Sequence, residues 1–227
     1  MKKFFRAVFI LILILASLLL GIRVYQQCRV KIISSKVYEV PQNYEELPVE
    51  NIIVVYVFDP NDLNAYAGFV DYIFIGKVEE VTGITYTDVE LIYHDFPIAV
   101  IDGYPQTHYK ITVLENIKGS LVKDITLTQG SGPAIGGKRM HLVAGQLMKE
   151  NDVHIFMAYT KDDGELHIGD AAGAVKLGSL QNAEEYSELR KENQVTETVQ
   201  KYIEAYKNQD ESHRYRERRL CIYDSSK

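Results

Sequence analysis

The sequence contains no tryptophan and only two cysteines among its 227 residues. Cys28 and Cys221 are too few for the dense disulfide framework of small secreted domains, and they show no spacing typical of a zinc site. The sequence leaves open whether they are free thiols or form one bridge between the ends of the chain. With 46% hydrophobic residues, the chain has enough apolar material for a packed core.

An excess of positive charge is also lacking, since the formal net charge is −6. Binding to a phosphate backbone needs basic residues, so we expect no nucleic-acid partner. Motifs that carry chemistry are missing as well: no GxSxG nucleophile motif, no GxxxxGK[ST] phosphate loop and no EF-hand loop. We therefore expect a non-catalytic protein without a cofactor.

A long uncharged run, AVFILILILASLLLGI, is present at residues 7–22. Three basic residues precede it and Arg23 follows it. A spanning helix needs about 20 apolar residues, with about 17 as the lower limit, and two phenylalanines before the run extend its apolar surface. A cleavable signal needs small residues at −3 and −1 of the cut, and this segment offers a poor match. We expect residues 1–23 to form an uncleaved signal-anchor helix, with a cleaved secretion signal as the alternative.

The charges around this run indicate an orientation. Basic residues before an apolar helix favour keeping that end in the cytoplasm, although further basic residues after the run weaken the asymmetry. The short basic flank resembles the start of a secretory signal. We expect a single-pass protein of the cell membrane with its large domain outside the cytoplasm, or a secreted protein if the segment is cleaved.

The next part of the chain predicts a stalk and then a β-rich domain. Residues 24–50 are mixed and polar, and we expect a membrane-proximal stalk with one short strand at 30–33. Residues 51–180 contain short apolar or alternating runs typical of strands, and Asn61 is placed to cap a helix over 62–69. Gly76, in the middle of the strand expected at 70–81, indicates a bulge or a bend.

Between these strands, residues 82–106 are rich in polar residues, proline and glycine, which predicts a long excursion that includes a hairpin at 98–101. The other strands are expected at 52–58, 108–116, 124–129, 139–143, 153–159 and 165–169.

Residues 181–227 predict C-terminal helices and a charged tail. Asn182 and Glu185 have the spacing of a capping box. An amphipathic stripe follows, which packs on the sheet or on a partner, and the tail at 213–219 is expected to fray. The stripe consists of Val195, Val199, Tyr202, Ile203 and Tyr206.

Four segments carry a family resemblance: DYIFIGKV at 71–78, YKITVLENIKG at 109–119, DITL at 124–127, and VHIFMA at 153–158 after a loop with Gly145. Their order resembles the small OB-type barrels of the netrin-like and metalloproteinase-inhibitor (TIMP-like) superfamily. It is also similar to uncharacterised surface-anchored proteins of low-GC Gram-positive bacteria. The resemblance covers residues 65–177 and implies a mainly β, antiparallel barrel within residues 51–180. It does not imply protease inhibition, because no cysteine begins the domain.

Three histidines, His141, His154 and His167, recur at intervals of thirteen residues. Imidazoles from neighbouring strands can bind zinc or copper, but this spacing is not a ligand motif, so we expect scattered surface histidines. His94, Asp95 and Asp102 offer parts of an acid–base set without a nucleophile.

The leading hypothesis is a membrane-anchored binding domain, with the lipid bilayer and a surface protein or cell-wall component as partners. Two alternatives remain: a metal-dependent hydrolase that uses the histidines, and a structural subunit docked through the amphipathic stripe.

Overall fold

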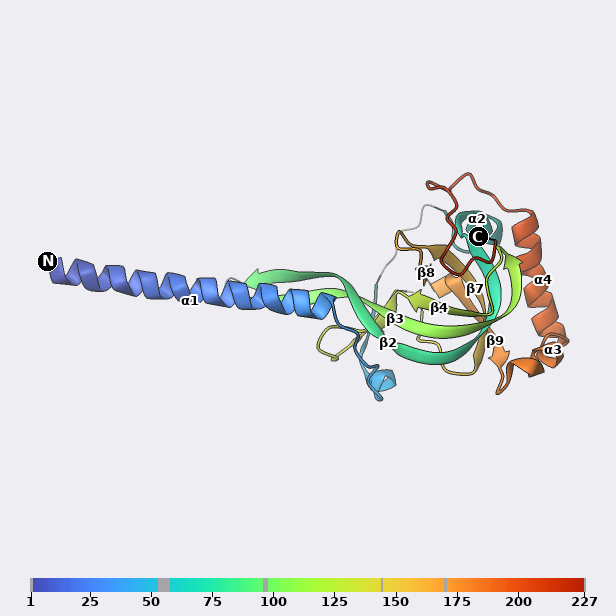
Figure 1. Ribbon diagram of the computed structural model, residues 1–227, viewed down its shortest axis with the longest axis horizontal. Helices are drawn as coiled ribbons and strands as arrows, with labels where there is room; N and C mark the ends of the chain where they lie inside the picture. Colours follow the sequence, from blue (N-terminus) through green and yellow to red (C-terminus); the bar gives the residue numbers. More distant parts are fainter. Residues whose placement is uncertain (1, 53–57, 96–97, 144, 170, 227) are drawn as a thin grey trace.

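The computed structural model describes residues 2–52, 58–95, 98–143, 145–169 and 171–226, and it places one long helix beside a β-rich body (Figure 1). Strands hold 37% of the residues and helices 31%, which makes the chain mainly β, as expected. The shorter helices and turns are η1 (Tyr44–Glu46), α2 (Leu63–Phe69), η2 (Ala171–Gly173), η3 (Ala183–Glu185), α3 (Tyr186–Leu189) and α4 (Asn193–Lys207).

The long helix is α1 (Lys2–Ser34), and it contains the apolar run. It continues beyond the anchor expected at 1–23, so the short strand expected at 30–33 is wrong. No proline interrupts the sequence before residue 41, and the helical hydrogen bonds therefore continue through the first part of the expected stalk. Near its end Ile33 is buried against Ile84 and Tyr86, which ties α1 to the body.

A closed five-stranded barrel forms the body. Around the barrel the order is β2, β3, β4, β8 and β7, and β7 pairs again with β2. All neighbours are antiparallel except β4 and β8, which are parallel. The barrel strands are β2 (Tyr72–Asp95), β3 (Ile98–Lys118), β4 (Asp124–Gln129), β7 (Asp152–Thr160) and β8 (Leu166–Ile168).

Four short strands complete the sheets. β9 (Ala174–Ser179) extends the main sheet beside β7. β1 (Val49–Asn51), β5 (Ser131–Pro133) and β6 (Met140–Leu142) form a small separate sheet in the order β1-β6-β5. Most of the strand predicted at 52–58 lies outside the described residues.

The hairpin of β2 and β3 contradicts the excursion predicted at 82–106. β2 is 24 residues long and β3 is 21, and they stay paired to Asp95 and Ile98. Gly83 and Gly103 lie at register shifts of the ladder, and Pro105 pairs with Tyr86 without a shift, so these residues belong to the hairpin and not to a loop. One shift falls between Ile75 and Gly76, as predicted, and a Cβ on Gly76 would lie 2.5 Å from Ile111 Cγ2.

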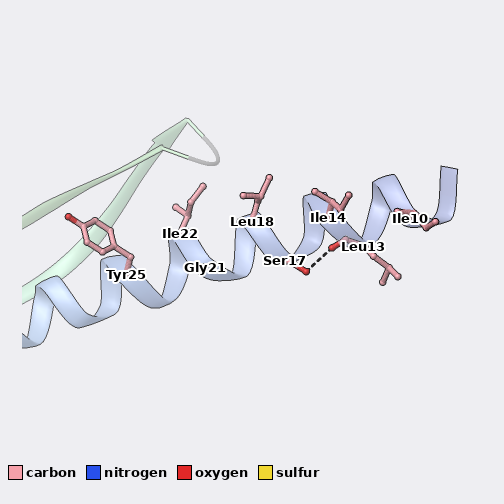
Figure 2. A pocket seen from close by; sticks show the side chains of 8 residues that line it. All are labelled: Ile10, Leu13, Ile14, Ser17, Leu18, Gly21, Ile22 and Tyr25. Atoms are coloured by element: carbon pink, nitrogen blue, oxygen red, sulfur yellow. Dashed lines mark hydrogen bonds between the residues drawn. The ribbon is translucent and has the colours of Figure 1, made fainter. Parts of the chain in front are cut away.

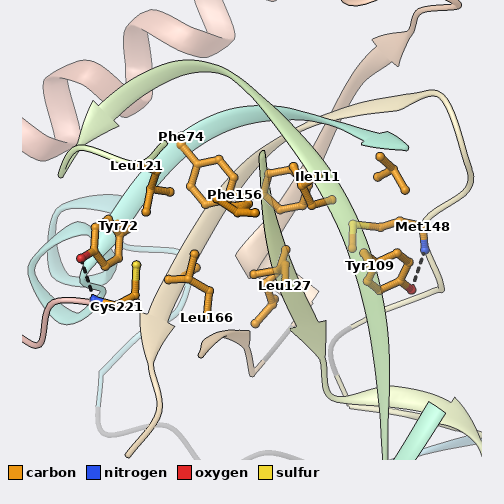
Figure 3. Close-up of a cluster of buried hydrophobic side chains, with 14 residues drawn as sticks. Tyr72, Phe74, Tyr109, Ile111, Leu121, Leu127, Met148, Phe156, Leu166 and Cys221 are labelled. Carbon is orange, nitrogen blue, oxygen red and sulfur yellow. Dashed lines mark hydrogen bonds between the residues drawn. The ribbon is translucent and has the colours of Figure 1, made fainter. Parts of the chain in front are cut away.

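Aromatic and aliphatic side chains fill the barrel (Figure 3). The rings of Phe74 and Phe156 stack with their centroids 5.0 Å apart. Tyr109 is fully buried, and its hydroxyl donates to Gln129 Oε1 at 2.8 Å, so its polar atom is satisfied inside the core. The barrel interior is therefore a packed core.

A second core lies between the outer face of the barrel and the helices. Ile73 and Ile75 of β2 and Ile155 of β7 face α2 and α4, while the alternate residues face the barrel interior. β7 is therefore apolar on both faces, as expected for a strand covered on both sides.

The tail at 213–219 does not fray as predicted, because it supplies the counter-charges of a buried carboxylate. Asp71 is fully buried and forms ion pairs with Arg214 and Arg216. Further along, Cys221 is fully buried, and its backbone N–H donates to the Tyr72 hydroxyl at 2.9 Å. The tail thus closes one end of the barrel.

The predicted caps also differ from the observed ones. α2 is capped by Asp62 rather than Asn61, since Asp62 Oδ1 accepts from Asn64 N at 2.9 Å. Asn182 makes no side-chain cap to the backbone, and its amide instead donates to Glu185 Oε1 at 3.3 Å. Neither cysteine forms a disulfide, and Cys28 is exposed whereas Cys221 is buried.

Candidate functional site

The apolar surface of α1 is the first candidate. In the described part of the chain, this one helix is long and apolar enough to cross a membrane, and none of its most apolar window is buried. Side chains such as Phe9, Leu11 and Leu20 are more than half exposed. A helix of a soluble protein buries its apolar face, so this surface needs another apolar environment.

One stripe of that surface runs along a single side of the helix. Ile14, Leu18 and Ile22 project from the same side, as their spacing of four residues requires (Figure 2). Together with Ile10 and Tyr25 they border a shallow, open apolar depression. In the hydrocarbon layer of a bilayer such a depression would face lipid.

The far end of the β2–β3 hairpin lies beside α1 (Figures 1 and 2). An apolar groove of about 460 Å³ separates the two elements. Its helix side is formed by six residues between positions 16 and 26, and its hairpin side by Tyr93. The hairpin therefore reaches the level at which the apolar run of α1 gives way to Arg23.

A smaller cleft of about 310 Å³ lies between the end of α1 and the barrel. Tyr38 and Tyr86 line it with their rings edge to face at 5.5 Å, and Arg29 stands at its border. The Tyr86 hydroxyl donates to the Pro133 carbonyl at 3.1 Å. Glu39 also lines the cleft, so its lining combines aromatic faces with one guanidinium and one carboxylate.

The structure does not bring the three predicted histidines together. They lie on three different strands, His141 on β6, His154 on β7 and His167 on β8. Within the described residues, no group of three His, Cys, Asp or Glu side chains is placed to hold a metal ion. The histidines are also buried, with 6–7% of their surface exposed, so the expectation of surface histidines is wrong.

Burial explains the charge state of two of these rings. Loss of hydration lowers the pKa of His154 to about 4 and that of His167 to about 3. His167 Nδ1 lies 2.8 Å from Thr128 Oγ1, whereas neither ring nitrogen of His154 has a hydrogen-bond partner. Asp152 is the nearest acid to His154, with Oδ2 at 3.8 Å from Nε2. These rings are neutral core residues at physiological pH.

The remaining acid–base candidates do not form a set in the described part of the chain. Asp102 Oδ1 accepts a hydrogen bond from Gly103 N at 2.9 Å, which is turn-like backbone chemistry. The side chains of His94 and Asp95 lie outside the described part.

The amphipathic stripe of α4 is turned toward the barrel. Val195, Val199 and Tyr202 are buried in the second core, and Ile203 and Tyr206 pack against it. The sequence left open whether the stripe packs on the sheet or on a partner, and in the structure it packs on the sheet. Ile203 and Tyr206 stay partly exposed in this conformation, whereas the other three residues of the stripe are covered.

Lys118 is a buried polar residue that the sequence analysis missed. Its Nζ donates to the Ala67 carbonyl at 2.6 Å and to Gln209 Oε1 at 2.7 Å, and it lies 5.8 Å from the Tyr206 ring centroid. Burial lowers its pKa to about 8. Lys118 thus links β3 to α2 and to the end of α4. In the sequence it is a lysine directly before a turn glycine, and this local context does not indicate a buried structural role.

No protein-family model matches the chain, and no curated protein matches it. The assignment of function therefore depends on the geometry of α1, the hairpin and the barrel.

Proposed function

We propose that the chain is a single-pass membrane protein whose barrel lies outside the cytoplasm and binds another macromolecule at the cell surface. The observation that carries this proposal is the division of the chain between two solvents. α1 leaves its apolar surface unburied, while the barrel buries two cores of its own. Hydrocarbon accommodates the apolar surface of α1, and water surrounds the barrel, whose apolar side chains are buried in its cores.

The strand order supports an OB-type barrel of the netrin-like kind. When the barrel strands are numbered 1 to 5 along the chain, their hydrogen-bonded order around the barrel is 1-2-3-5-4, and strand 4 pairs with strand 1. The third and fifth strands form the parallel pair. OB-type barrels are Greek-key barrels that bind ligands on the face of their second and third strands. Here those strands are β3 and β4, on which Lys110, Asp124 and Thr126 are exposed. This choice of face is an analogy at the level of the fold.

Cys28 offers a direct test of the topology, because it is exposed on α1 beyond the apolar run while Cys221 is buried. A membrane-impermeant maleimide added to intact cells should label the chain once, and Cys28→Ser should abolish the label. Cys221→Ser should leave it unchanged. Labelling that appears only after the cells are lysed would place the barrel in the cytoplasm and overturn the proposal.

The binding face is tested by photocrosslinking on intact cells. A benzophenone amino acid at Lys110 or Thr126 should crosslink a partner, and one at Gln200, exposed on the outer side of α4, should not. The same adduct from Gln200 alone would move the binding face to the helices.

A further inference from the structure

We propose that the end of the β2–β3 hairpin enters the interfacial layer of the bilayer and forms a second lipid contact beside α1. The inference rests on the proposed membrane anchoring of α1, and it adds a second surface with phospholipid as its partner. The residues of this surface are Ile92, Tyr93, Ala99 and Val100.

The end of the hairpin lies at the same level as the end of the apolar run of α1. α1 changes from apolar to charged at Ile22 and Arg23, which marks the boundary between hydrocarbon and water for an anchored helix. Tyr93 borders the same groove as these two residues. The hairpin end therefore lies at the depth where tyrosine is enriched in membrane proteins.

The hairpin also changes from apolar to acidic residues close to this level. Ile92 pairs with Val100, and two residues closer to the barrel Glu90 pairs with Asp102 on the same face. Two strand residues span about 7 Å. An apolar pair followed at once by an acidic pair fits a strand that leaves the lipid interface and enters water.

The side chains at the end of the hairpin are exposed. Tyr93 is 46% exposed and Val100 52% exposed, although both are large and apolar in character. They therefore add exposed apolar surface on a second element, next to the unburied apolar surface of α1. Residues 82–107 contain no lysine or arginine, so the contact depends on apolar and aromatic burial rather than on anionic headgroups.

With two contacts, the barrel is held close to the membrane in one orientation. α1 alone would let the barrel tilt against the membrane plane, whereas the hairpin adds a contact away from the helix axis that resists this tilting. The face of β3 and β4 would then keep a constant angle to the bilayer.

Because the chain has no tryptophan, single tryptophan substitutions report depth without background. The full chain is reconstituted in phosphatidylcholine vesicles whose acyl chains carry bromine near the headgroup. Tyr93→Trp and Val100→Trp should each lose emission relative to unbrominated vesicles. Phe9→Trp, in the apolar run, is the anchor control, and Tyr215→Trp, 73% exposed on the tail, is the control for water.

The outcomes separate the two proposals. Quenching of Tyr93→Trp and Val100→Trp, with Tyr215→Trp unquenched, supports the hairpin contact. If Phe9→Trp is quenched while both hairpin variants behave like Tyr215→Trp, the hairpin contact is overturned and the anchor stands. An unquenched Phe9→Trp overturns the anchor and the contact together. A blue shift that depends on the protein-to-lipid ratio, without quenching, assigns the surface to a second copy of the chain and overturns the lipid contact.

Discussion

At the scale of single residues, the most consequential interaction is the buried carboxylate of Asp71. It is fully buried, accepts from Thr160 N at 2.8 Å and from Arg216 Nη2 at 2.8 Å, and pairs with Arg214 as well. Asp71→Asn keeps the size of the side chain but leaves two guanidinium groups without their counter-charge. Breaking a buried ion pair costs about 3–5 kcal/mol, and we expect a loss of this order in urea unfolding of the detergent-solubilised chain.

The matched control is Asp162→Asn. Asp162 also pairs with an arginine of the tail, Arg219, but its side chain is 92% exposed. Exposed ion pairs contribute about 0–1 kcal/mol, so this variant should unfold close to the wild type. Equal losses for Asp71→Asn and Asp162→Asn would show that burial does not determine the strength of these pairs.

Buried His154 predicts a loss of stability in acid. Its folded pKa is about 4, because burial penalises the imidazolium, and an unfolded histidine titrates near 6.5. Between these values the unfolded chain binds more protons, so the free energy of unfolding falls as the pH falls from about 6.5 to about 4. The contribution of this ring is about 3 kcal/mol. Urea unfolding at several pH values measures it.

His154→Gln should flatten the acid limb of this pH profile, because glutamine does not titrate. His213→Gln, at an exposed position, should keep the wild-type slope. An acid limb unchanged in His154→Gln would assign the acid sensitivity to other groups, of which His167 is the first to test.

At the scale of elements, sequence alternation predicted the strands that are covered by a regular core. The strand expected at 124–129 coincides with β4, in which Ile125 and Leu127 face the barrel interior. β7 was predicted within one residue at each end, since its β-branched and aromatic run is apolar on both faces. The local sequence pattern is sufficient to predict a strand when each face of the strand packs against a single layer of the fold.

The same reasoning failed for the hairpin and the tail, for different reasons. The distal hairpin lies away from the barrel core, so Pro105 and Gly103 were interpreted as loop residues although the register absorbs them. The tail is stabilised by ion pairs to Asp71, which lies more than 140 positions earlier in the chain. A charged segment gives no local sign that its counter-charge is buried elsewhere.

The packing of α4 on the barrel gives a prediction at this scale. Val199 is fully buried in the second core, and Gln200, its neighbour, is exposed. Val199→Ala removes two methyl groups and leaves a cavity, which should cost about 2 kcal/mol. Gln200→Ala should change the free energy of unfolding by less than about 0.5 kcal/mol. Urea unfolding of both variants measures the difference.

Equal effects of Val199→Ala and Gln200→Ala would mean that α4 does not pack on the barrel in solution. The stripe would then be free for a partner, and docking through the helix would become the stronger interpretation.

At the scale of the whole molecule, hydropathy alone predicted the long apolar helix but not what lies beside it. The run at 7–22 is a local property of the sequence, so its helix could be predicted without tertiary information. The place of Tyr93 next to that helix depends on the length of the hairpin and on the direction in which α1 leaves the body, where Ile33 is buried. Neither can be derived from a local pattern.

The two ends of the chain should therefore differ in their effect on stability. Deleting residues 2–23 removes exposed apolar surface and keeps Ile33 in place, so the shortened chain should be soluble without detergent and should unfold at nearly the temperature of the full chain. Deleting residues 213–227 removes both ion-pair partners of Asp71 and the buried Cys221. At about 2–4 °C for each kcal/mol lost in a chain of this size, the second deletion should lower Tm by about 10 °C or more. Thermal unfolding followed by circular dichroism, with the full chain in detergent as reference, measures both.

If deleting residues 2–23 lowers Tm as much as deleting the tail, α1 is part of the fold rather than an attached anchor, and its apolar surface is covered by the body in solution.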